Sequence, residues 1–199
     1  LPAVDRSSSK VLMKVYTTDR SNDRSEPERI KVGVADHAVA HAGSTLVTSG
    51  LGSCVGIALT DVDAGVAGLA HAMLPAASAE AEAGARGDDT RTRGNDTPSD
   101  VWKYVDTAVP ALAREVVDAG ADRARIEARV AGGSAMFEFE SSAGAVGERN
   151  VAATREALEA HSIPIVATDV GGDYGRSLTL DVETAELSIR RAHGETHVI

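Results

Sequence analysis

Apolar and polar residues follow strand patterns at several places along the chain. In residues 29–34 (RIKVGV), apolar Ile30, Val32 and Val34 alternate with less apolar neighbours, which predicts a half-buried strand. Residues 54–59 (CVGIAL) and 66–74 (VAGLAHAML) are almost wholly apolar, as is typical of strands covered on both faces. Further strands are predicted at 44–48, 125–130, 163–168, 177–181 and 186–190, the last two joined as a hairpin through 182–185.

Two segments have the period of an amphipathic helix instead. Ser99 can cap a first helix that ends at Gly120, and Pro110 inside it predicts a kink near Asp106. Its apolar face holds Val101, Val105, Ala108, Leu112 and Val116. A second helix is predicted at 148–161. Strands with two helices between them predict an α/β (α+β) domain, a layered mixed β-sheet flanked by helices.

The length of 199 residues suits one domain with tails. Residues 1–29 are polar without lasting periodicity and predict a flexible N-terminal tail, so we expect the domain at 30–192 and a short C-terminal tail at 193–199. Residues 76–97 contain no large apolar side chain, which predicts a mobile loop.

Composition narrows the choice of partners. Hydrophobic residues make up 43%, enough for a core, but aromatic residues only 3%, and the formal net charge is -10. Nucleic-acid binding relies on clustered cations and stacking aromatics, so it is disfavoured. Lysine occurs only four times, at Lys10, Lys14, Lys31 and Lys103. Acidity with so little lysine leads to the hypothesis of a salt-adapted prokaryote, where screening weakens repulsion among surface carboxylates.

The sequence offers no export signal and no clear metal site. The absence of a signal-peptide pattern predicts a cytoplasmic protein. The uncharged stretch 38–60 contains four glycines, so we interpret it as two strands and a turn rather than a membrane span. A lone Cys54 excludes an intrachain disulfide and a cysteine-based metal cluster. We expect His37 and His41 to be a solvated pair, and His193 and His197 to lie in the polar tail; no metal or cofactor is predicted.

The most informative chemistry surrounds Cys54. A turn, Gly50-Leu51-Gly52-Ser53, delivers this thiol to the start of an apolar strand, and its backbone amides could form an oxyanion hole. A strand follows the turn, so the glycines do not match a phosphate-binding loop, which must open a helix. A thiol needs a base, and His71 ends the adjacent apolar strand. From the residues alone, a buried inert cysteine and a hydrogen-bonded core histidine remain the favoured alternative.

Five sequence blocks change that balance. In order along the chain they are TSGLGSCVGIAL, GLAHAMLP, AGGSAMF, VGERN and TDVGGDYGRSL. Over residues 31–191 the sequence resembles the CheD family of chemoreceptor glutamine deamidases. The resemblance places the family's catalytic Thr, Cys and His on Thr48, Cys54 and His71. It also implies a fold similar to the cytotoxic necrotising factor-like cysteine hydrolases.

The resemblance implies that Cys54 deamidates glutamine side chains of chemotaxis receptors through a thioester, with His71 as base and Thr48 orienting it. The blocks suggest Ser53, Gly132, Gly133, Tyr174 and Arg176 as substrate-binding residues; turns between strands are the alternative for the glycine-rich ones. A CheC-type phosphatase is an implied partner. Two other functions stay open, a regulatory partner of that phosphatase and a methylesterase acting on receptor glutamates.

Overall fold

The computed structural model describes residues 15–16, 28–77, 101–135 and 145–199. Its strands form two sheets, a six-stranded sheet in the order β1-β3-β6-β5-β7-β8 and a five-stranded sheet in the order β11-β10-β9-β4-β2. The strands are β1 (Val15–Tyr16), β2 (Glu28–Lys31), β3 (Asp36–His41), β4 (Ser44–Leu51), β5 (Val55–Asp61), β6 (Val66–Ala72), β7 (Glu127–Gly132), β8 (Ile165–Val170), β9 (Arg176–Asp181), β10 (Leu187–Arg191) and β11 (Thr196–Val198). The two helices are α2 (Val105–Asp118) and α3 (Val146–Ala160).

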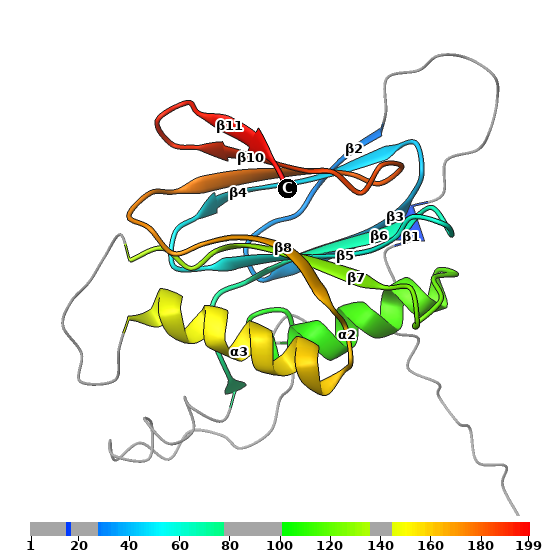
Figure 1. Ribbon diagram of the computed structural model, residues 1–199, viewed down its shortest axis with the longest axis horizontal. Helices are drawn as coiled ribbons and strands as arrows, with labels where there is room; N and C mark the ends of the chain where they lie inside the picture. Colours follow the sequence, from blue (N-terminus) through cyan, green and yellow to red (C-terminus); the bar gives the residue numbers. More distant parts are fainter. Residues whose placement is uncertain (1–14, 17–27, 78–100, 136–144) are drawn as a thin grey trace, which may run out of the picture.

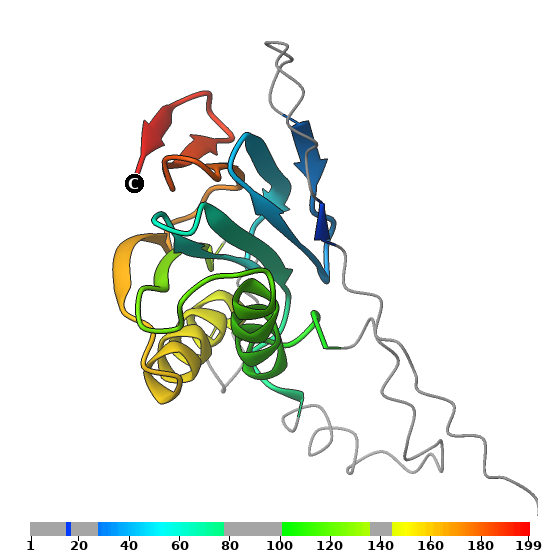
Figure 2. The same cartoon turned by 90° about the vertical axis from the view of Figure 1, so that its right-hand side faces the viewer.

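The elements stack in three layers (Figures 1 and 2). Both helices cover one face of the six-stranded sheet, and the five-stranded sheet covers the other. Leu112 of α2 and Leu158 of α3 belong to the core under the helices, whereas Leu46 and Leu180 belong to the core between the sheets. Every residue of β5 and β6 is buried because both faces of these strands are covered. The layered α+β class is therefore confirmed.

The five-stranded sheet has its outer face open. Along β9, buried residues alternate with half-buried ones, because Arg176, Leu178 and Leu180 point inward and the residues between them point outward. The predicted hairpin is present, since β9 and β10 pair antiparallel across 182–185. Ala185 in this turn has φ +57°.

The prediction failed at the start of the domain. Strand β2 ends at Lys31, not at Val34, and Ala35 turns the chain at φ +52° into β3, which the sequence did not predict. The interpretation of His37 as solvated is wrong. Its ring is 7% exposed, stacks on Trp102 with ring centroids 3.4 Å apart, and places Nε2 2.6 Å from Glu115 Oε2. His41 is half-buried, with Nε2 3.1 Å from the carbonyl oxygen of Ala119.

The first helix also begins later than expected. Its N-cap is Tyr104, whereas Ser99 lies outside the described residues. Backbone pairing explains the delay, because Met73 and Leu74 donate their N–H groups to the carbonyl of Lys103, and Tyr104 stays extended in a bridge with Leu74. The helix continues through Pro110, and the kink near Asp106 stays a prediction. The second helix begins at Val146, close to its predicted start.

Both expected tails contribute strands. Strand β1, within 1–29, pairs parallel with β3. Strand β11, within 193–199, pairs antiparallel with β10, and His197 Nε2 lies 2.7 Å from Asp169 Oδ2, so His197 does not lie in a free tail. Residues 78–97 of the expected loop lie outside the described residues. No described helix has the length and apolarity needed to cross a membrane.

Candidate active site

The proposed nucleophile and base share one face of the six-stranded sheet. His71 of β6 pairs with Gly56 of β5, and Cys54 lies two residues before Gly56. Cys54 lies in the bend directly before β5, the strand that pairs with the strand of His71. Cys54 packs against the core between the two sheets and is half-buried. The thiol and the imidazole therefore both face the layer between the sheets.

Thr48 approaches the same imidazole from the opposite sheet. Its Oγ1 lies 2.8 Å from His71 Nδ1, and this is a hydrogen bond between two buried side chains. His71 Nε2 is buried without a hydrogen-bond partner among the described residues. One ring nitrogen is thus fixed by β4, and the other has no hydrogen-bond partner among the described residues.

Burial keeps the two reactive groups neutral. Desolvation lowers the pKa of His71 from 6.5 to about 4, because the charged imidazolium loses water without gaining an acidic partner. Desolvation also raises the pKa of the Cys54 thiol above its ordinary value. At neutral pH the free protein therefore holds a thiol and an uncharged imidazole, not a preformed thiolate–imidazolium pair.

The end of β7 fixes the turn that carries Cys54. The N–H of Gly133 donates to the carbonyl of Cys54, and the N–H of Ser134 donates to the carbonyl of Gly52, each at 2.8 Å. Gly132 has φ +117°, and a Cβ at this position would lie 2.3 Å from the carbonyl oxygen of Cys54. Only glycine permits that approach. Gly132 and Gly133 therefore shape the turn at residues 50–53, which is called the nucleophile turn below after the role proposed for Cys54.

Asn150 is a residue that the sequence placed only at a helix start. It lies on α3, is fully buried, and its Nδ2 donates to the carbonyls of Ser53 and Met73, both at 2.8 Å. Ser53 directly precedes Cys54, and Met73 lies two residues after His71. One amide group therefore ties together the two segments that carry the reactive side chains. The sequence did offer one signal for this role, because Asn150 is a polar residue in the VGERN block at the start of the predicted second helix.

Tyr174 and Arg176 form a cluster with Asp169 and Ser134. Arg176 is buried and donates to Asp169 Oδ1, Ser134 Oγ and the carbonyls of Gly171 and Tyr174. Its guanidinium also stacks over the Tyr174 ring at 4.3 Å. These bonds occupy all five N–H groups, so Arg176 has none left for a substrate in this conformation. The cluster supports the turn through Ser134.

The described residues contain no group of three or more His, Cys, Asp and Glu side chains arranged to hold a metal ion. A thiol and an imidazole that both face the layer between the sheets, with a hydroxyl bonded to the imidazole, are the groups that a nucleophile, a general base and an orienting residue require. Such a set performs acyl transfer, in which a carbonyl carbon is attacked by sulfur and then by water.

Comparison with known proteins identifies the family. The family model described as CheD chemotactic sensory transduction matches residues 88–191. The probable chemoreceptor glutamine deamidase CheD of Haloarcula marismortui is 40% identical over 92% of this chain and 98% of its own length. The chain belongs to the CheD family. This confirms the resemblance on which the three catalytic assignments depend.

Two further relatives of this CheD chain match over most of its length. The probable chemoreceptor glutamine deamidase CheD 2 of Geobacter metallireducens is 44% identical over 81% of this chain and 92% of its own length. The chemoreceptor glutamine deamidase CheD of Bacillus licheniformis is 40% identical over 83% and 91%. A crystal structure of the Neisseria meningitidis protein NMB0706 aligns with a TM-score of 0.40 and 9% identity over 73% of this chain and 63% of that chain. Family membership therefore comes from sequence over nearly the whole domain.

Proposed function

We propose that this CheD protein hydrolyses glutamine side chains of chemotaxis receptors to glutamate, with Cys54 as nucleophile. The observation that carries the proposal is the hydrogen bond between Thr48 and His71 on the face that His71 shares with Cys54. The names of the relatives, which are glutamine deamidases of chemoreceptors, supply the substrate. A cytoplasmic site of action agrees with such a substrate, and a CheC-type phosphatase belongs to the proposal as a partner.

The tautomer of His71 follows from its two ring nitrogens. A buried N–H without an acceptor is costly, so the proton belongs on Nδ1, where Thr48 Oγ1 accepts it. Nε2 then presents its lone pair. In this state the imidazole can accept the proton of the Cys54 thiol, and Thr48 keeps the ring oriented in the way that an Asp or Asn does in other triads.

The reaction takes two steps. As Sγ of Cys54 attacks the carboxamide carbon, His71 Nε2 takes the thiol proton, and backbone N–H groups of the turn at Ser53 and Cys54 stabilise the oxyanion. The protonated Nε2 then donates that proton to the nitrogen, and ammonia leaves a thioester. Water gives a proton to Nε2 and attacks the thioester carbon, the C–S bond breaks, and Sγ recovers the proton.

The pKa values set the timing of proton transfer. Since burial disfavours both the thiolate and the imidazolium, proton transfer accompanies the attack instead of preceding it. Negative charge then passes from sulfur to the oxyanion, where the backbone donors of the turn receive it.

The test is mass spectrometry of a receptor cytoplasmic fragment after incubation with the protein. Deamidation adds about 1 Da to a glutamine-bearing peptide, whereas hydrolysis of a glutamate methyl ester removes about 14 Da. We expect the gain with the wild-type protein and no change with Cys54→Ala. A Cys54→Ala variant with full activity would overturn the mechanism, and a 14 Da loss alone would identify a methylesterase.

A further inference from the structure

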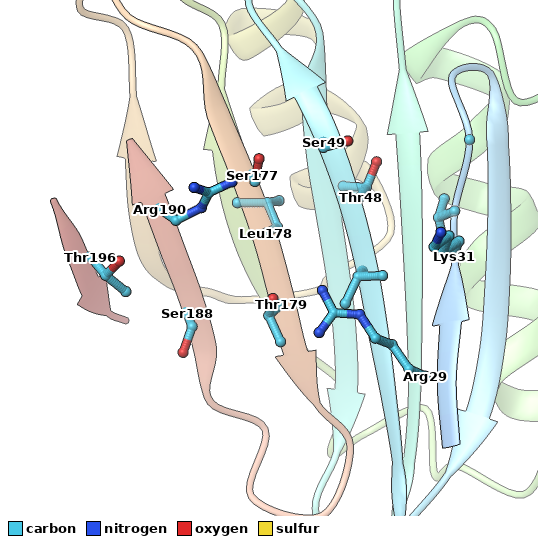
Figure 3. A pocket seen from close by; sticks show the side chains of 13 residues that line it. Arg29, Lys31, Thr48, Ser49, Ser177, Leu178, Thr179, Ser188, Arg190 and Thr196 are labelled. Carbon is cyan, nitrogen blue, oxygen red and sulfur yellow. The ribbon is translucent and has the colours of Figure 1, made fainter. Parts of the chain in front are cut away.

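The outer face of the five-stranded sheet carries a groove of about 580 Å³ (Figure 3). Side chains of Arg29 from β2 and Arg190 from β10 reach over the middle strands β4 and β9. Hydroxyl-bearing and apolar side chains line the space between them. The hydroxyl groups belong to Thr48, Ser49, Ser177, Thr179, Ser188 and Thr196, and the apolar side chains are Val32, Val47 and Leu178.

The groove is positively charged on an acidic protein. Arg29, Lys31 and Arg190 are exposed, and none has an ion pair or side-chain hydrogen bond with a described residue. The groove lining contains no Asp or Glu, although the whole chain has a net charge of -10. Cations on an acidic protein are stabilised by neighbouring carboxylates, so three cations that have no carboxylate partner among the described residues indicate an anionic partner.

Protection of a sheet edge explains only part of this pattern. Charged residues on edge strands prevent pairing between molecules, and β2, which carries Arg29 and Lys31, is an edge strand. Arg190 lies on β10, between β9 and β11, where no edge needs protection. Its guanidinium therefore adds positive charge to the groove and does not protect a sheet edge.

The groove continues to the nucleophile turn. A smaller hollow of about 200 Å³ shares Ser177 and Arg190 with the groove and is also lined by Gly50. Gly50 begins the turn that leads to Cys54. A polypeptide that lies along the groove therefore passes beside the segment that carries the thiol.

We propose that this groove, lined by Arg29, Lys31 and Arg190, binds an acidic stretch of the same polypeptide that carries the target glutamine. The inference rests on the proposed deamidase function and names the surface that recruits its substrate. Carboxylates of the stretch pair with the three cations, and the hydroxyl groups bind its backbone or polar side chains. Such contacts form equally in the bound substrate and in the transition state, so they lower KM and leave kcat unchanged.

A charge-matched pair of triple variants tests the proposal. The groove variant is Arg29→Gln, Lys31→Gln, Arg190→Gln. The control variant is Arg114→Gln, Arg123→Gln, Arg155→Gln, which removes three exposed cations of the helical side and gives the same net charge. On the receptor cytoplasmic fragment we expect KM to rise about tenfold in the groove variant, with kcat retained, and to change less than about twofold in the control. Equal effects in both variants would overturn the proposal.

Binding separates failure of this inference from failure of the deamidase proposal. In a Cys54→Ala background, fluorescence anisotropy measures the Kd of the labelled receptor fragment without turnover. Two results together support the groove even where no deamidation is seen. The fragment binds more weakly to the groove variant than to the control variant, and lowering the salt concentration tightens its binding to the protein with the intact groove. Unchanged Kd in the groove variant overturns it even where deamidation is confirmed. Groove-dependent binding of an RNA oligomer or of anionic lipid vesicles, without binding of the receptor fragment, also contradicts it.

Discussion

Replacing Asn150 with alanine tests whether α3 positions the reactive groups. The change removes two hydrogen bonds of 2.8 Å and leaves the carbonyls of Ser53 and Met73, which lie in half-buried residues, without that donor. Each unpaired buried acceptor costs about 1–3 kcal/mol, so we expect a loss of about 2–4 kcal/mol in the free energy of unfolding. Because the turn before Cys54 and the segment after His71 lose their common tie, kcat should fall about 10- to 100-fold.

A matched variant separates positioning from stability. Leu158→Ala on the same helix removes a fully buried apolar side chain of the core under the helices, costs about 2–5 kcal/mol, and breaks no hydrogen bond to Ser53 or Met73. Both variants are assayed for deamidation well below their unfolding temperatures, and urea unfolding measures their stability. Asn150→Ala should lose kcat with little change in KM, whereas Leu158→Ala keeps kcat. Equal kcat values in the two variants would refute positioning by Asn150.

Three further predictions concern the base, its orienting residue and the surface charge. Thr48→Val should lower kcat about tenfold or more without abolishing turnover, while Thr48→Ser restores it; a Thr48→Val variant as inactive as Cys54→Ala would contradict an orienting role. Because the pKa of His71 is about 4 in the folded protein and 6.5 unfolded, the unfolded chain binds the proton between these values. Stability should therefore be complete above about pH 6.5 and decline by about 3 kcal/mol as the pH falls to about 4, and a His71→Gln variant should lack this decline in urea titrations. If the charge of -10 reflects a salt-rich cytoplasm, the unfolding temperature should rise from about 0.1 M to several molar KCl, and a flat curve would contradict that hypothesis.

The sequence predicted the central strands because burial leaves a strong pattern. Residues of β5 and β6 are apolar almost without interruption, so the pattern alone indicates both their strand character and their place inside the layers. Family motifs supplied Thr48, and the structure brings its hydroxyl to His71 across the gap between the sheets. Periodicity alone could not have shown this contact, because the two residues belong to different sheets.

The remaining features depend on contacts between distant segments. His37 looked like a solvated histidine because its partners, Trp102 and Glu115, lie more than 60 residues away in sequence. Strand β11 is short and polar, and only its pairing with β10 reveals it. Arg176 lies in a family motif and was therefore suggested as a substrate-binding residue. The sequence could not indicate that its five N–H groups are all hydrogen-bonded within the protein, because their partners come from several separate segments.

Trapping the acyl-enzyme tests the central claim most directly. A glutamine-bearing receptor peptide is mixed with the protein, and the reaction is quenched in acid within one turnover. Mass spectrometry then measures the mass of the intact protein. We predict an adduct equal to the peptide mass less ammonia, about 17 Da, located on Cys54 and released by hydroxylamine, as expected of a thioester. Formation of glutamate with no adduct on Cys54, or with undiminished rate in Cys54→Ala, would contradict a cysteine-based deamidase.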